Sequence, residues 1–104
     1  MSVIPSKQYN KLKERHPKFM EALEELGKAA KQAGPIDEKT AQLIQLAAAT
    51  ANRSEGAVHS HTRRALEAGA SSEEIYQAIL LLTSTVGFPN VTAALSWAGD
   101  VIEG

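Results

Sequence analysis

One predicted helix, which ends at Gly69, carries the residues best suited to chemistry. His61 shares its helical face with small and apolar residues, which favours a ligand pocket over open solvent. An imidazole in such a place is suited to giving and taking protons. Arg64 lies three residues further along the same helix and is suited to binding a carboxylate, or to pairing with Glu67 or Glu73 on a solvated face.

Two histidines in this helix, His59 and His61, form a His-x-His pattern of the kind found among metal ligands. Residues two apart on a helix point in directions that differ by roughly 200°, so they cannot share one coordination sphere within a chain. A metal shared by these histidines would need ligands from another subunit, no spacing of Asp or Glu argues for that, and we expect no metal. A lone helical histidine is more often structural than catalytic, so a structural interpretation of His61 also stays open.

The elements that must position His61 are all predicted to be helices. Gly and Pro residues divide the chain into segments whose apolar residues recur at helical spacing. Ser54 is a predicted N-cap of the helix that carries His61, and Ser71 and Glu74 form a predicted capping box. We expect the helices that contain Gln42 and His61 to lie antiparallel and in contact. The predicted helices cover residues 17–33, 38–51, 54–69, 72–86 and 89–102, after an N-terminal helical arm over residues 1–16.

Length and composition indicate a single domain over residues 1–104 that associates with itself. Apolar residues make up 43% of the chain and aromatic residues only 5%. Ala and Leu dominate the apolar positions, which favours close packing of helices within a subunit or between subunits. The segment 72–86 is apolar around most of its circumference, so we expect it in the centre or at an interface.

Charge and cysteine content exclude several classes of function. The formal net charge is −1, so we expect neither a nucleic-acid partner nor a membrane partner. The chain has no cysteine, which excludes disulfides, thiolate metal sites and a thiol-based peroxidase. The N-terminal residues lack the pattern of a signal peptide, and we expect a cytoplasmic protein.

Three stretches, residues 37–44, 61–75 and 86–90, together resemble the carboxymuconolactone decarboxylase family, which includes the alkylhydroperoxidase D-like proteins. The stretches contain the string His-x-Arg-x-Ala, a glycine, Glu-Ile and Gly-x-Pro, and the resemblance covers roughly residues 20–102. It implies an all-α bundle of about five to six helices with the alkylhydroperoxidase D-like fold. It also implies assembly into trimers or hexamers and activity without a cofactor.

The peroxidase branch of this family uses a Glu, a Cys-x-x-Cys pair and a His. When the chain is aligned on His61, the resemblance places Gln42 at the Glu position and Ser54 and Ala57 at the two Cys positions. Neither a hydroxyl nor a methyl group can replace an attacking thiolate. We therefore expect no hydroperoxide reduction by that mechanism.

The decarboxylase branch also lacks the Cys pair and keeps a His followed two residues later by an Arg, here His61 and Arg63. The resemblance therefore implies a cofactor-free lyase on a small carboxylated cyclic acid, with His61 as general acid–base. Gln42, Ser54, Arg63 and Arg64 are the predicted substrate-binding residues. Arg63 projects away from His61 on the helix, so it joins the same pocket only if the site lies between subunits and is otherwise structural. A binding or assembly protein that keeps the fold without the chemistry is the alternative interpretation.

Overall fold

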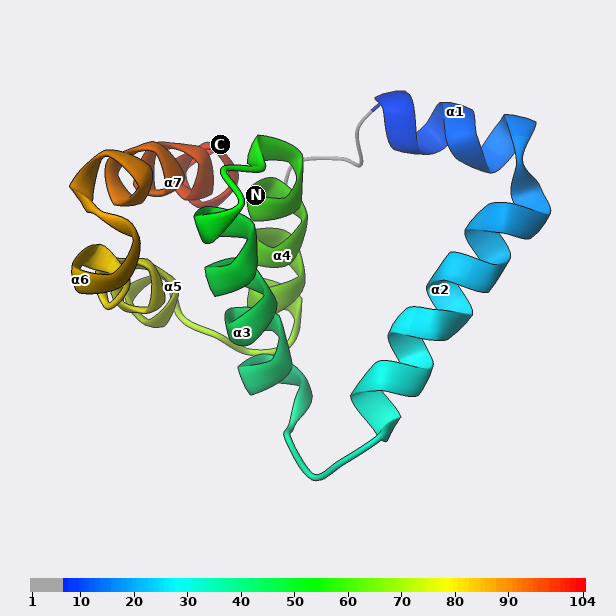
Figure 1. Ribbon diagram of the computed structural model, residues 1–104, viewed down its shortest axis with the longest axis horizontal. Coiled ribbons are helices and arrows are strands. Elements are labelled where there is room, and N and C mark those ends of the chain that lie inside the picture. Colours follow the sequence, from blue (N-terminus) through cyan, green and yellow to red (C-terminus); the bar gives the residue numbers. More distant parts are fainter. Residues whose placement is uncertain (1–6) are drawn as a thin grey trace. The chain divides into compact units, whose positions relative to one another are not determined.

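The computed structural model describes residues 7–104, and all regular structure within them is helical (Figure 1). The predicted all-α class is therefore confirmed. None of the helices in this range is long and apolar enough to cross a membrane. The helices are α1 (Lys7–Arg15), α2 (Pro17–Gln32), α3 (Glu38–Ala51), α4 (Glu55–Glu67), α5 (Ser72–Leu80), α6 (Thr83–Val86) and α7 (Phe88–Ile102).

Contacts divide the described chain into two compact units, residues 7–37 and residues 38–104. Each unit is described by itself below. The expectation of one domain over residues 1–104 stays a prediction, and the first six residues of the predicted N-terminal arm lie outside the described range.

In residues 7–37, polar contacts join α1 to α2. The Tyr9 hydroxyl donates a hydrogen bond to Glu24 Oε2 over 2.5 Å, and Lys13 Nζ lies 3.4 Å from the same oxygen. The Lys13 ammonium also lies 5.5 Å from the centre of the Tyr9 ring, within the range of a cation–π interaction. The predicted apolar stripe of α2 is present, but its largest members, Phe19 and Leu26, are more than 60% exposed.

In residues 38–104, α3 and α4 form an antiparallel pair in direct contact (Figure 1). The turn between them is short because Arg53 adopts a left-handed conformation, with φ of 56°, and the Ser54 N–H donates to the Ala49 carbonyl. Ser54 then caps α4, since its side chain accepts a hydrogen bond from the Ala57 N–H. The predicted N-cap and the predicted antiparallel contact are both confirmed.

The core of this unit lies between α3, α4, α5 and α7. Alanines on α3, α4 and α7 bring the helix backbones close together, as the composition suggests. Gln42 and Thr62 are buried polar residues in the same region. The fully buried large apolar side chains are Leu46, Val58, Ile75, Ile79, Val91 and Val101.

The prediction of one helix over residues 72–86 is wrong, because the structure divides this segment into α5 and α6. The Leu82 N–H donates to the carbonyl three residues back, at Ile79, so the helix tightens as it ends. The Thr83 hydroxyl donates to the Leu80 carbonyl over 2.8 Å, which gives the backbone an alternative to a continued helix. As a result Leu80 and Leu81 are exposed rather than central.

The predicted capping box of α5 is confirmed. The Ser71 side chain accepts a hydrogen bond from the Glu74 N–H, and Glu74 Oε1 accepts one from the Ser71 N–H over 2.9 Å. Lys39 Nζ of α3 lies 3.1 Å from Glu74 Oε2 and so links the box to a second helix. The Ser71 N–H, followed by the Lys39 ammonium, holds the pKa of the Glu74 carboxyl below its ordinary value.

This lowered pKa predicts an acid-sensitive contribution to stability. Because the folded protein favours the ionised Glu74, the contribution is complete above the ordinary pKa of 4.5 and is lost as the pH falls through the lower folded pKa. We expect Glu74→Gln to flatten the acid limb of a plot of unfolding free energy against pH. Urea denaturation from neutral pH down to about pH 2 measures that slope.

Glu73→Gln is the matched control, since it removes a carboxylate from the same first turn but outside the capping box. An equal flattening by both variants would show that total charge, rather than the capping box, sets the acid sensitivity.

Candidate functional site

The α3–α4 pair brings Gln42 and His61 together although they lie 19 residues apart in the chain. His61 Nδ1 and Gln42 Oε1 are 2.8 Å apart, which is a short hydrogen bond. The short turn at Arg53 and Ser54 keeps the helices antiparallel, so a residue in the first half of α3 meets one in the middle of α4. The two candidate residues therefore form one site.

A third residue, Glu38, determines which ring nitrogen of His61 carries the proton. Gln42 Nε2 donates a hydrogen bond to Glu38 Oε2 over 2.7 Å, and a carboxylate can only accept. The amide oxygen of Gln42 consequently faces His61 Nδ1, so Nδ1 must be the protonated nitrogen. In the neutral ring Nε2 then holds the lone pair, which makes it the atom suited to accept a proton.

Burial differs along this chain of hydrogen bonds, which we call the Glu38–Gln42–His61 relay. Gln42 is only 1% exposed, so its amide is held in one orientation by its two partners. His61 is half-buried and is thereby reachable from outside the core. A fixed support beneath a partly accessible imidazole is the arrangement that acid–base chemistry requires.

The other predicted substrate-binding residues, Ser54, Arg63 and Arg64, lie on α4 or at its start and outside the Glu38–Gln42–His61 relay. Ser54 uses its hydroxyl oxygen as the N-cap of α4 and lies seven residues before His61, about 10 Å along the helix axis. A ligand in contact with both residues must therefore be about that long. Arg63 and Arg64 are half-buried on α4, two and three residues after His61. Their predicted role in binding substrate stays a prediction.

The structure adds two residues to which the sequence patterns assign no role. Glu38 is one, and its spacing of four residues to Gln42 within a helix is the signal that predicts contact. Gln45 is the other: its Oε1 is buried and has no hydrogen-bond partner among residues 7–104. Gln45 lies one turn after Gln42 on the same face of α3. Its amide oxygen is thus a buried acceptor that the described residues leave without a donor.

His59 and His61 have different partners, as their spacing predicts. His59 Nε2 lies 2.9 Å from Asp100 Oδ2 of α7, whereas His61 bonds to Gln42 of α3. The His59 imidazole thus joins α4 to α7, and the His61 imidazole joins α4 to α3.

Comparison with known proteins agrees with this fold. The model of the carboxymuconolactone decarboxylase family matches residues 17–100, and the chain belongs to this family. The chain is 32% identical over 101 residues to the uncharacterized protein MJ1511 of Methanocaldococcus jannaschii, which covers 93% of this chain and 94% of that protein. The family resemblance of the sequence is therefore confirmed.

Two further relatives extend this comparison. An uncharacterized protein of Haemophilus influenzae is 37% identical over 59 residues, which are 57% of this chain and 52% of that protein. The crystal structure of apo-lpg0406, a carboxymuconolactone decarboxylase family protein from Legionella pneumophila, superposes with a TM-score of 0.75 at 26% identity. That match covers 89% of this chain and 86% of the other.

Proposed function

We propose that the protein is a cofactor-free lyase that decarboxylates a small carboxylated cyclic acid, with His61 as its general acid–base. The observation that carries the proposal is the Glu38–Gln42–His61 relay, in a chain of the carboxymuconolactone decarboxylase family. A hydrogen bond that fixes the tautomer of a half-buried imidazole prepares the ring for proton transfer.

The proposed reaction assigns one proton to His61. As the bond to the carboxylate carbon breaks, carbon dioxide leaves and the electron pair stays on the ring carbon, delocalised into the neighbouring carbonyl. The imidazolium form of His61 then gives its Nε2 proton to that carbon. Nδ1 keeps its proton throughout, so the hydrogen bond to Gln42 persists in both protonation states.

Arginine side chains supply the charge that this substrate needs. Arg64, half-buried on α4 about one turn after His61, is the proposed partner of the substrate carboxylate or of the developing negative charge on the carbonyl. Arg63 points away from His61 on the same helix, so it takes part only if the site lies between two subunits. The absence of cysteine from the sequence rules out the thiol mechanism of the peroxidase branch.

An NMR titration of the histidine side chains tests this proposal directly. In protein labelled with ¹⁵N, we expect His61 to show a protonated Nδ1 and a lone pair on Nε2 in its neutral form. On addition of a panel of cyclic and unsaturated carboxylates, including carboxylated muconolactone, we expect one compound to shift the His61 resonances and to lose carbon dioxide on incubation.

His16 provides the internal control, because its imidazole is exposed at the start of α2 and outside the relay. A His61 signal that is indifferent to every compound would favour the alternative function, a binding or assembly protein of the same fold. Gln42→Leu should weaken the preference for the Nδ1 tautomer, since it removes the acceptor.

We also propose that the subunits associate. The observation is the exposed apolar face of α2, where Phe19, Leu23 and Leu26 are 61%, 48% and 66% exposed. Three large apolar side chains on one helix face are typical of a surface that packs against something outside residues 7–37, and we propose a second subunit as that partner. Light scattering is expected to give a mass of three or six times the 11.1 kDa of one chain, and Leu26→Glu is expected to lower that mass. A stable monomer would contradict the proposal.

A further inference from the structure

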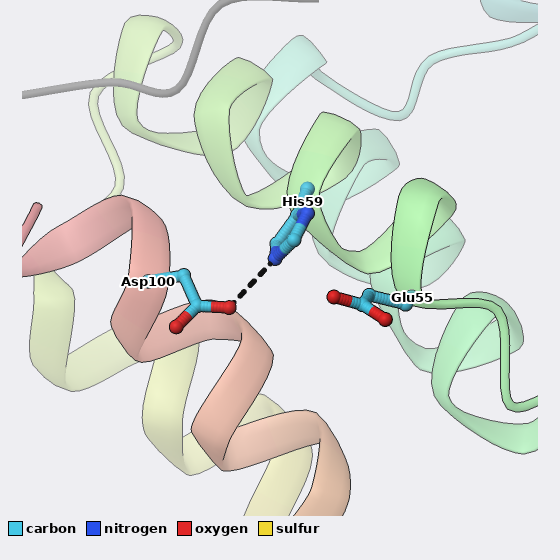
Figure 2. A group of neighbouring side chains, drawn as sticks. All are labelled: Glu55, His59 and Asp100. Carbon is cyan, nitrogen blue, oxygen red and sulfur yellow. Dashed lines mark hydrogen bonds and ion pairs between the residues drawn. The ribbon is translucent and has the colours of Figure 1, made fainter. Parts of the chain in front are cut away.

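A second group of polar side chains lies where α4 meets α7 (Figure 2). Glu55 and His59 extend from α4, and Asp100 extends from α7 toward them. His59 Nε2 and Asp100 Oδ2 are 2.9 Å apart. His59 and His61 differ by roughly 200° in direction around α4, so this group is separate from the Glu38–Gln42–His61 relay.

The distances in this group suit a metal ion. One ligand atom from each residue, the imidazole nitrogen and one oxygen of each carboxylate, lies within 4.8 Å of both others. In a tetrahedral site with bonds of about 2.1 Å, the ligand atoms are about 3.4 Å apart. Glu55 and Asp100 are exposed, so a small rotation of either side chain closes the remaining gap.

The helices hold these side chains in register. Glu55 and His59 are four residues apart and therefore share one face of α4. Val58 precedes His59 in α4, and Ala98 lies two residues before Asp100 in α7. Both side chains are fully buried, so they hold the backbones of α4 and α7 in the core at this point. Two helices thus present three ligands from fixed positions, which lowers the entropy cost of binding an ion.

The charge of the group also favours a cation. Two carboxylates lie close together, and one imidazole, which carries at most a single positive charge, does not balance both of them. Among residues 7–104, Asp100 pairs with His59 rather than with a Lys or Arg, and Glu55 forms no ion pair. A divalent ion would neutralise both carboxylates and join α4 to α7.

We propose that Glu55, His59 and Asp100 bind a divalent first-row transition metal, with water in the remaining positions. One nitrogen and two oxygen ligands suit Zn²⁺ or Co²⁺. Mg²⁺ and Ca²⁺ prefer ligand sets made only of oxygen, and Cu⁺ prefers sulfur. The site acts as a clamp between α4 and α7, and the proposal is independent of the chemistry at His61.

Titration of the tag-free, metal-stripped protein with Co²⁺ and Zn²⁺ tests the proposal. Trp97, the single tryptophan of the chain, lies one turn before Asp100 on α7, so bound Co²⁺ should quench its fluorescence. We expect saturation at one ion per chain by fluorescence and by calorimetry. We also expect Zn²⁺ to raise the thermal unfolding temperature, because the ion binds only the folded arrangement.

Variants identify the ligands. Glu55→Gln and Asp100→Asn preserve side-chain shape at exposed positions, so both should fold, and each should weaken Zn²⁺ binding by at least about tenfold. His59→Ala should abolish the Co²⁺ signal. Glu73→Gln and His61→Ala are matched controls, because each changes a carboxylate or an imidazole outside the proposed site. Both variants should bind Zn²⁺ and Co²⁺ as the wild type does. Absence of saturable binding, or binding that survives Asp100→Asn and His59→Ala together, would overturn the proposal.

Discussion

His61→Ala is expected to lower the decarboxylation rate by about 10²–10⁴-fold, the usual contribution of a general acid–base. The variant removes the only group of the relay that can deliver a proton to the substrate carbon. The substrate is the carboxylate that shifts the His61 resonances, and release of carbon dioxide at saturating concentration measures the rate. Binding of the carboxylate should change less than the rate, because Arg64, its proposed partner, remains.

Two further variants separate chemistry from structure. Gln42→Leu preserves the bulk of a buried side chain but removes the hydrogen bond to His61 Nδ1, so we expect a rate between those of the wild type and His61→Ala. His16→Ala, which changes an exposed histidine of α2, should leave the rate unchanged. If His61→Ala lowers the unfolding free energy but not the rate, the histidine is structural.

The second large effect is expected at Leu46, in the middle of α3. Its side chain is fully buried in the core of residues 38–104, beside other large apolar side chains. Leu46→Ala should lower the unfolding free energy by about 2–5 kcal/mol, through lost burial and the cavity left behind. Urea denaturation at a fixed protein concentration measures this difference, since association makes the midpoint depend on concentration.

Ile44→Ala is the matched control, because it truncates a branched aliphatic side chain of the same helix at a position that is 53% exposed. We expect its effect to stay within about 0.5 kcal/mol in a monomeric state. Equal effects at both positions would contradict the assignment of Leu46, rather than Ile44, to the core.

Local signals in the sequence predicted the helices well. Ser54, Ser71 and Glu74 act through bonds to residues within three positions, and the structure shows each of these caps. Gly69, with φ of 99°, follows α4 as the expected stop. The break between α5 and α6 escaped prediction because periodicity extends through it, and the deciding interaction is a hydroxyl bond from Thr83 to a carbonyl three residues back.

The candidate site was predicted only in part. The family resemblance pointed to Gln42 and His61, and the structure shows them bonded. Glu38 and Gln45 were given no role, although their spacings from Gln42 place them on its helix face. A polar residue on a helix gives the same sequence signal whether it is solvated or bonded within a site, so the pattern alone does not separate the two.

The sequence by itself determined most of the helices, their caps, the absence of cysteine and the family. Only the tertiary structure decided that Gln42 fixes the tautomer of His61 and that Asp100, 41 residues from His59, joins it at α4. Caps and periodicity depend on neighbours within one turn, which the chain order specifies directly. Contacts between α3, α4 and α7 depend on how the helices rotate to bury Leu46, Val58 and Ala98 together, and that packing sets which polar side chains meet.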